Sequence, residues 1–247
     1  MTEMRPRPLT EAPRSLSPGT VYLVLENIRE PSLSPEGLLE VLSQAEKKRA
    51  ASYRFEDDRL RSQVAWGLLR LFLGRIRGED PRDIEFVRNE FQKPLLPTGP
   101  SFSLAHSGDW VLLGVAAYGR FGIDVEAPRK LPNLFDLARI AFSVDEIREL
   151  GSYPEADRLK AFFRGWTRKE AFTKAIGGGL SVPLKQFTVT LAPDVEEALM
   201  WVAIPSEEDV PWRVRPLPEM PGALSALSWD QALQEIRWVD PGLLESR

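Results

Sequence analysis

Cysteine is absent from this chain of 247 residues, and histidine occurs once, as His106. Disulfides, thiolate zinc sites, iron–sulfur clusters and cysteine nucleophiles are therefore excluded, so a hydrophobic core must hold the fold together. The composition, 43% hydrophobic and 28% charged, supplies such a core and argues against a disordered chain. Metal sites that need two histidines are also excluded. Any metal must rely on carboxylate and water oxygens, which favours a hard ion such as magnesium.

The charge balance and the apolar runs exclude further classes. Lysine and arginine number 32 against 36 aspartates and glutamates, a net charge of −4, which disfavours a protein that coats nucleic acid. The longest uncharged apolar stretch, Trp110–Gly119, is far shorter than the ~20 residues that span a bilayer. Residues 1–20 contain four prolines, three arginines and no apolar run, unlike a signal peptide. We expect a cytoplasmic protein with no membrane partner.

Strand and helix signals divide the chain into two parts of similar size that meet near residue 120. We expect a loose extension over 1–20, a first α/β half over 21–120, and a second half with a C-terminal tail over 121–247. Predicted strands cover 21–25, 84–87, 102–104, 111–117, 122–126, 187–191, 200–204, 224–227 and 236–239, and predicted helices cover 35–42, 44–52, 57–76, 143–150 and 154–176. The fold class is therefore α+β.

Helix boundaries carry recognisable signals. Asp57 or Asp58 is suited to cap the long helix of the first half. Ser143 with Glu146 three residues later forms a capping box, which predicts a helix start. The three glycines at 177–179 predict the end of the long helix of the second half.

Two acidic residues close the predicted strand Gly122–Glu126. Asp124 and Glu126 are two apart in an extended segment, so both side chains leave the same face. Two neighbouring carboxylates suit magnesium, which keeps waters and phosphates as its other ligands. The pattern is common, and two solvated acids at a strand end remain an alternative.

The helix around residue 170 carries a more specific pattern. Trp166, Glu170 and Lys174 are spaced at i, i+4 and i+8, which places them on one helix face, with Lys169 on the flank. A third carboxylate followed by a lysine one turn later would complete a metal site and hold a phosphate. The alternative is an ordinary amphipathic helix with a glutamate–lysine pair worth a few tenths of a kcal/mol.

Two residues of the first half are candidates for weaker reasons. His106 ends a predicted strand and is followed by Ser107, but no G-x-S-x-G elbow of a hydrolase surrounds that serine. A structural histidine is the alternative. Lys93, in a loop before Pro94, is either a solvated cation or a phosphate contact.

Together, these segments resemble the 4′-phosphopantetheinyl transferases of the surfactin-synthetase-activating (Sfp-like) type. The motifs occur in the family's order from about Leu42 to Leu191: F-Q-K-P at 91–94, F-S-L-A-H-S at 102–107, G-I-D-V-E at 122–126, F-R-G-W-T-R-K-E-A-F-T-K at 163–174 and G-L-S-V-P-L at 179–184. The two motifs that carry the acidic residues, G-I-D-V-E and W-T-R-K-E-A-F-T-K, place 45 residues between Asp124 and Glu170.

The resemblance implies a fold of two similar α/β halves, related by a pseudo-twofold, around a central cleft. It also implies a magnesium-dependent transferase that uses coenzyme A as donor. Such an enzyme moves the 4′-phosphopantetheine arm to a serine of an acyl or peptidyl carrier protein and releases adenosine 3′,5′-bisphosphate. One chain would suffice to form the cleft, so we expect a monomer.

By motif match, the resemblance also implies roles for individual residues. Asp124, Glu126 and Glu170 would hold magnesium on the pyrophosphate. Glu170, directly or through a metal-bound water, would take the serine proton, and Lys174 would contact phosphate and stabilise the leaving oxygen. The expected coenzyme A contacts are Lys93, His106, Arg54, Arg61, Arg88 and Lys174, and Trp166 would pack beside the metal site.

Some departures and rivals accompany this hypothesis. Ala105 stands where the family often has serine, and the segment before Tyr53 carries Glu46 beside its basic residues Lys47, Lys48 and Arg49. Another magnesium-dependent transferase acting on a nucleotide pyrophosphate would share the carboxylates. A silent module that only binds carrier proteins is a rival of a different class. The sequence does not distinguish fatty-acid, polyketide, peptide-synthetase and lysine-pathway carriers.

The resemblance also points to a carrier-binding surface in the second half. The family docks its carrier near residues 136–150 and the Trp166 helix. Carrier proteins of this kind are acidic and this chain is net negative, so we expect a mainly apolar contact with a basic rim. The apolar candidates are Leu134, Phe135, Leu137, Ile140 and Phe142, some of which must be core, and the cations are Arg129, Lys130 and Arg139.

Overall fold

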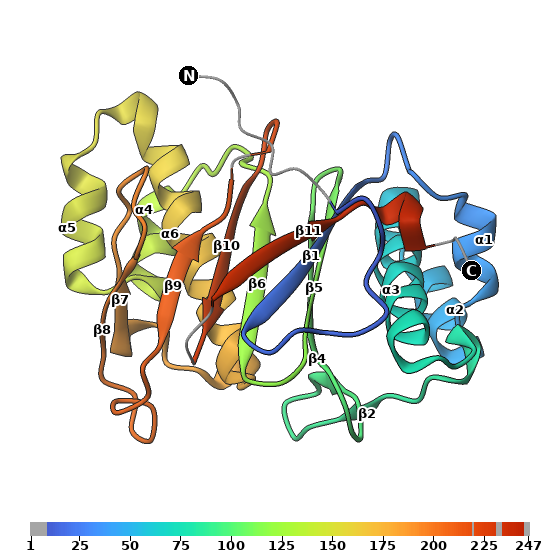
Figure 1. The fold of residues 1–247 in the computed structure, drawn as a ribbon. Helices are drawn as coiled ribbons and strands as arrows, with labels where there is room; N and C mark the ends of the chain where they lie inside the picture. The colour runs from blue at the N-terminus through green and yellow to red at the C-terminus, as the bar shows by residue number, and fades with distance from the viewer. Residues whose placement is uncertain (1–8, 219, 231–233, 245–247) are drawn as a thin grey trace. The chain divides into compact units, whose positions relative to one another are not determined.

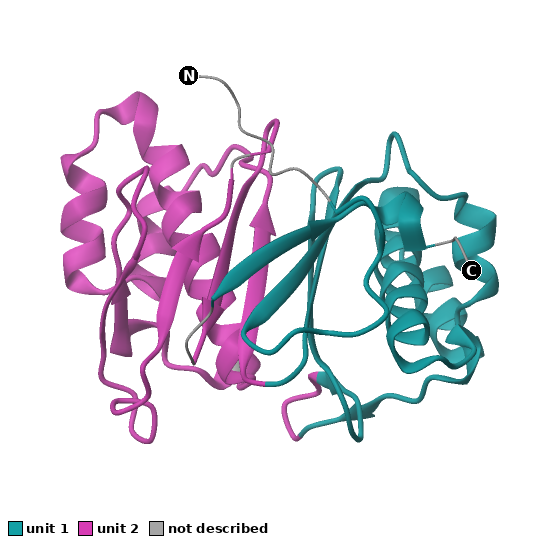
Figure 2. Cartoon of the chain, viewed as in Figure 1, with its two compact units in different colours: residues 1–89, 94–118, 232–247 teal, residues 90–93, 119–231 magenta. Residues whose placement is uncertain are grey.

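The computed structural model describes residues 9–218, 220–230 and 234–244. The chain forms two compact units (Figure 2). Unit 1 consists of residues 1–89, 94–118 and 232–247, and unit 2 consists of residues 90–93 and 119–231. This division differs from two continuous halves at two places, because the C-terminal residues belong with unit 1 and residues 90–93 belong with unit 2.

Unit 1 packs three helices on one face of a four-stranded sheet with strand order β11-β1-β5-β4 (Figure 1). Strand β11 pairs parallel to β1, and the other neighbours are antiparallel. Its elements are β1 (Thr20–Asn27), α1 (Pro35–Glu40), α2 (Gln44–Ala51), α3 (Glu56–Arg77), the 3-10 helix η1 (Pro81–Asp83), the short hairpin strands β2 (Val87–Arg88) and β3 (Pro94–Leu95), β4 (Ser101–Ser107), β5 (Trp110–Ala116), β11 (Glu235–Val239) and η4 (Pro241–Leu244).

The core of unit 1 lies between α3 and the sheet. Val64, Leu68 and Phe72 of α3 are fully buried, at the helical spacing that directs them to one side. The Glu46 carboxylate of α2 accepts a hydrogen bond from the backbone N of Ser43, the N-cap residue, and pairs with the buried Arg70 of α3 at 2.7 Å. The basic run after Gln44 is therefore attached to α3 by its one acidic member.

The segment before β1 also belongs to this core. Ala12 is buried, and Leu9 and Leu16 pack against the core of unit 1. Leu9 N donates to the carbonyl of Trp238 in β11, and Arg75 of α3 donates to the Ala12 carbonyl. The expected loose extension is thus attached to unit 1 at Leu9, Ala12 and Leu16, while other residues of 9–20 are exposed, and residues 1–8 lie outside the described residues.

Unit 2 packs α6 against a three-stranded antiparallel sheet with strand order β6-β10-β9. A separate hairpin pairs β7 with β8, and α4 and α5 pack on α6 (Figure 1). The elements are β6 (Phe121–Glu126), α4 (Leu134–Ala141), α5 (Val144–Ser152), α6 (Glu155–Ile176), η2 (Gly179–Ser181), η3 (Leu184–Gln186), β7 (Phe187–Val189), β8 (Leu199–Val202), β9 (Arg213–Pro216) and β10 (Leu224–Trp229).

The predicted α+β class is confirmed, and so are all the predicted helices, with small shifts of their ends. The predicted cap of α3 is wrong. Phe55 is the N-cap residue, and Asp57 and Asp58 lie inside the first turn, where arginines bind their carboxylates. The predicted strand 84–87 is also wrong, because Ile84 ends η1 and pairing begins only at Val87.

Strand β9 and helix α4 are not among the predicted elements. Strand β9 has only four residues, of which Val214 alone is buried, so its alternation is too short to indicate a strand from the sequence. Across the described part of the chain, no helix is long and apolar enough to cross a membrane.

Candidate functional site

Strand β6 and helix α6 bring together the acidic and basic residues of the two motifs in unit 2. Lys174 Nζ donates a hydrogen bond to Asp124 Oδ1 at 2.7 Å. The Asp124 side chain is 8% exposed, against 30% for Lys174. The other carboxylate oxygen, Asp124 Oδ2, is buried with no hydrogen-bond partner. A buried carboxylate with one unsatisfied oxygen favours a further cation at this position.

The three predicted metal ligands influence one another electrostatically. Burial raises the pKa of Asp124 to about 7, Lys174 opposes the rise, and the charges of Glu126 and Glu170 add to it. Burial also raises the pKa of Glu170, again opposed by Lys174 and reinforced by Glu126. Like charges close to one another disfavour ionisation, so a cation beside Asp124 and Glu170 would favour their charged forms.

A glycine allows this close approach of strand and helix. A Cβ placed on Gly122 would lie 2.2 Å from the Ala171 carbonyl oxygen, 2.4 Å from Ala175 N and 2.8 Å from the Lys174 carbonyl carbon. Any side chain here would overlap the backbone of α6. The glycine of the G-I-D-V-E motif therefore sets the separation between Asp124 and the helix, a function that the sequence reading missed.

The carboxylates do not form a ready-made metal cluster. Within 9–218, 220–230 and 234–244, no group of three or more histidine, aspartate or glutamate side chains could hold a metal ion as they stand. The Lys174 ammonium is the cation bound to Asp124, and Glu126 pairs with Arg129 at 3.4 Å. The assignment of all three carboxylates to magnesium thus stays a prediction.

Lys169, next to Glu170, is buried and structural in its contacts. Its ammonium pairs with Glu146 at 2.8 Å and donates to the carbonyls of Leu184 and Phe187, each at 2.8 Å. Both charged side chains are inaccessible, with exposures of 1% and 0%. Burial lowers the pKa of Lys169 to about 8 and raises that of Glu146, and the partner opposes each shift. The sequence predicted the capping box at Ser143 and thus singled out Glu146, but it did not indicate that Glu146 pairs with Lys169.

Lys93 lies in unit 2 and contacts the C-terminal end of α6. Its ammonium donates to the carbonyl oxygen of Lys174 at 2.6 Å. Burial and the nearby Lys174 ammonium lower the pKa of Lys93 to about 8. The preceding residue, Gln92, has a positive φ of 65°, a conformation that favours glycine. The structure thus gives Lys93 a protein partner, and its role toward phosphate stays a prediction.

The other predicted coenzyme A contacts belong to unit 1. His106 is exposed near the end of β4, paired in register with Val111. Arg54 and Arg88 are also exposed, and the Arg54 guanidinium lies 5.4 Å from the centre of the Phe55 ring.

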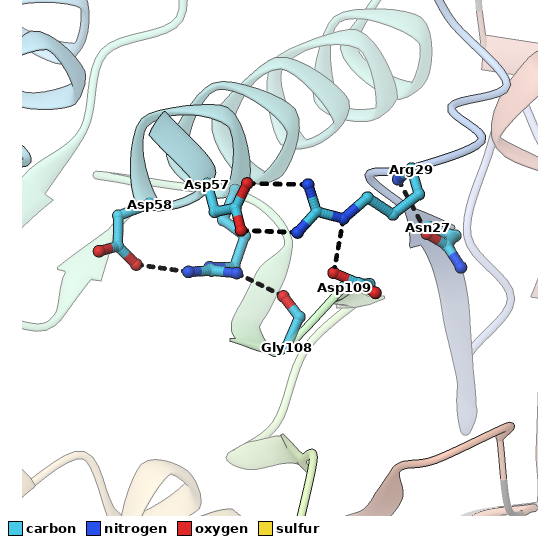
Figure 3. A network of polar contacts seen from close by, with 7 residues as sticks. Asn27, Arg29, Asp57, Asp58, Gly108 and Asp109 are labelled. Carbon is cyan, nitrogen blue, oxygen red and sulfur yellow. Dashed lines mark hydrogen bonds and ion pairs between the residues drawn. The ribbon is translucent and has the colours of Figure 1, made fainter. Parts of the chain in front are cut away.

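Arg61 is engaged in a polar network at the turn that follows His106. Its guanidinium binds Asp58 at 2.6 Å and donates to the Gly108 carbonyl. In the same network, Arg29 lies between Asp57 and Asp109 (Figure 3). The contacts join the start of α3 to the β4–β5 turn, and Arg61 would have to share its guanidinium to reach a phosphate.

The structure sorts the predicted carrier-binding residues. Phe142 is buried in the core, and Leu134 and Phe135 pack partly against it. Leu137 and Ile140 of α4 are 40% and 73% exposed. Val144, at the start of α5, is 73% exposed and was not predicted. Of the predicted cations, Arg139 pairs with Asp136 and Arg129 with Glu126, while Lys130 is exposed. Trp166 stacks on Phe162, in agreement with a packing role.

Known proteins are similar to this chain over most of its length. Residues 120–218 match the model of the 4′-phosphopantetheinyl transferase superfamily, and residues 33–118 match that of the 4′-phosphopantetheinyl transferase N-terminal region. The 4′-phosphopantetheinyl transferase HetI of Nostoc sp. is 34% identical over 70% of this chain and 75% of its own length. Sfp of Bacillus subtilis, also named a 4′-phosphopantetheinyl transferase, is 30% identical over 64% of this chain and 70% of its own length. The chain therefore belongs to the 4′-phosphopantetheinyl transferases, a family of transferase enzymes.

Proposed function

We propose that this enzyme transfers the 4′-phosphopantetheine arm of coenzyme A to a serine of an acyl or peptidyl carrier protein, acting as a cytoplasmic monomer with magnesium. The observation that carries the proposal is the buried Asp124, whose free oxygen and acidic neighbours favour a cation and whose other oxygen binds Lys174. A cation held by these carboxylates, together with Lys174, would supply the positive charge that a pyrophosphate substrate needs.

The residues present fit magnesium. Asp124, Glu126 and Glu170 would supply hard oxygen ligands. Asp124 Oδ2, which is buried without a hydrogen-bond partner, would gain a partner in the bound ion. When bound, the ion would offset the negative charge that gathers on the pyrophosphate during transfer. Lys174 would then exchange its contact with Asp124 for the phosphate oxygens.

The remaining steps are carried by the chain's own residues. The serine oxygen forms a bond to the phosphorus that carries the pantetheine arm, and the bond from that phosphorus to the bridging oxygen breaks. Glu170, whose pKa is raised by burial, takes the serine proton. Lys174 stabilises the charge on the departing oxygen of adenosine 3′,5′-bisphosphate. His106, with Arg54, Arg61 and Arg88 in unit 1, would bind the coenzyme A phosphates.

The carrier would dock on the exposed apolar side chains of α4 and α5. Leu137, Ile140 and Val144 supply that surface, hereafter the α4–α5 patch. The cations Arg139 and Arg148 at its margin are each paired with an aspartate one turn away, so they contribute less net charge than the sequence alone would indicate. This supports a mainly apolar contact with a weak basic rim.

Mass spectrometry of a panel of apo carrier proteins tests the proposal. After incubation with coenzyme A and magnesium, at least one carrier should gain the mass of one phosphopantetheine on its serine, and adenosine 3′,5′-bisphosphate should appear in equal amount. Chelation of magnesium should abolish both. Binding of a carrier without any gain in mass would identify the silent module. Turnover of coenzyme A or another nucleotide pyrophosphate without a modified carrier would identify the rival transferase.

A further inference from the structure

Lys93 contacts the backbone of Lys174, the residue proposed to stabilise the leaving oxygen. Its ammonium donates to the backbone carbonyl of Lys174, while the Lys174 side chain extends to Asp124. Lys174 lies in the last turn of α6, where the final four carbonyls have no partner within the helix. Gly177 N closes the turn on the Thr173 carbonyl. The next carbonyl, that of Lys174, is the one that Lys93 binds.

We propose that Lys93 is a positioning residue, which fixes the last turn of α6 and thereby aims the Lys174 side chain, and that direct binding of phosphate is not its main role. The inference rests on the proposed function, since it gives Lys174 its task on the leaving oxygen.

Two contacts hold the Lys174 backbone from different elements. On one side, the backbone of β6 at Gly122 lies so close that a Cβ there would be 2.8 Å from the Lys174 carbonyl carbon. Lys93 binds the carbonyl oxygen of the same residue. A strand and an ammonium group therefore determine where the backbone of Lys174 lies, and a long flexible side chain is aimed best from a fixed backbone.

Charge explains why a lysine suits this position. The C-terminal end of a helix carries partial negative charge on its carbonyls, which attracts a cation. A charge-assisted hydrogen bond to such a carbonyl is stronger than a neutral one. Burial and, to a smaller extent, the nearby Lys174 ammonium disfavour the charged form of Lys93, and the hydrogen bond to the Lys174 carbonyl is a contact that favours it.

The experiment compares Lys93→Met, which removes the donor, with Lys93→Arg, which keeps one, and with Lys185→Met as an exposed-lysine control. For Lys93→Met we expect kcat to fall roughly tenfold to a hundredfold, the equivalent of one charge-assisted hydrogen bond, with the Kd for coenzyme A within about threefold of wild type. Lys93→Arg should recover most of kcat. In a Lys174→Ala background, Lys93→Met should cause little further loss, because both changes act through one group.

Hydrogen exchange supplies a readout that does not depend on transfer. Amides of residues 174–178 should exchange faster in Lys93→Met than in wild type and return toward wild type in Lys93→Arg. If Lys93→Met instead weakened coenzyme A as much as His106→Ala, with unchanged kcat and unchanged exchange, the positioning role would be overturned in favour of phosphate binding. If wild-type enzyme transferred nothing, the proposed function would fail, and the exchange data would still decide whether Lys93 holds the turn.

Discussion

Replacement of Lys169 by methionine tests how the motif helix is held in unit 2. The change keeps a long apolar stem and removes the ammonium, which makes three contacts at 2.8 Å, with Glu146 and with the Leu184 and Phe187 carbonyls. Glu146, with 0% side-chain exposure, would keep only its two backbone donors, Ser143 N and Val189 N. Removing one partner of a buried pair costs about 3–5 kcal/mol, because the other charge is left uncompensated.

The assay is urea unfolding at pH 7.5, followed by circular dichroism, together with thermal melts. We expect a loss of about 3–5 kcal/mol in the free energy of unfolding, and a fall in Tm of about 6–20 °C for a chain of this size. The matched control is Lys160→Met, an exposed lysine of the same helix, which should stay within about 0.5 kcal/mol of wild type. The double variant Lys169→Met with Glu146→Gln should lose less than Lys169→Met alone, since no buried charge remains.

The pH dependence of the stability lost in Lys169→Met tests whether the unpaired Glu146 charge causes the loss. Burial already raises the pKa of Glu146 above 4.5 in the folded protein, and losing its cation raises it further. A group whose folded pKa exceeds its unfolded pKa contributes full stability below the unfolded value and loses it as pH rises through the folded value. The deficit relative to wild type should therefore be smaller at pH 5 than at pH 8. A deficit below about 1 kcal/mol at pH 8, or one that grows on acidification, would refute the reasoning.

Four further predictions concern the site and its surfaces. Asp124→Ala and Glu170→Ala should each lower kcat by orders of magnitude while Tm stays within a few degrees, because each removes a ligand of the ion that offsets charge on the pyrophosphate. Near-wild-type turnover with magnesium would exclude the three-carboxylate site. His106→Ala should raise the Kd for coenzyme A in calorimetry and leave the carrier Kd unchanged, and equal coenzyme A affinity would make the histidine structural. Gly122→Ala should lower the free energy of unfolding by at least about 1–3 kcal/mol in urea titrations, because its Cβ overlaps the Ala171 carbonyl, and a neutral result would mean that strand and helix part easily. Ile140→Asp should raise the carrier KM by about tenfold or more, because it places a charge in the α4–α5 patch. Salt up to ~0.5 M should raise the wild-type carrier KM only moderately, since it screens only the rim. A rise of several orders of magnitude with salt would show that charge dominates docking.

Local patterns were sufficient for the elements that carry the site. Two acids two residues apart in a strand share a face, and residues at i, i+4 and i+8 share a helix face, because these periods belong to the backbone itself. The resemblance in motif order indicated the family, and the matches over 33–118 and 120–218 confirmed it. The capping box at Ser143 and the glycine stop of α6 at Gly177 were likewise predicted from the sequence and confirmed.

Contacts between distant segments required the tertiary structure. Nothing in the local pattern shows that Lys93 binds a carbonyl 81 residues away, that Lys169 is paired with Glu146, or that β11 returns to lie beside β1. The same holds for exposure around the end of α4, where Ile140 is exposed and Phe142, the residue that follows the helix, is buried in the core. A residue's type and spacing determine which groups it can bind and the face from which it projects. Which groups are actually within reach depends on how the whole chain packs, and that packing assigned each charge its partner here.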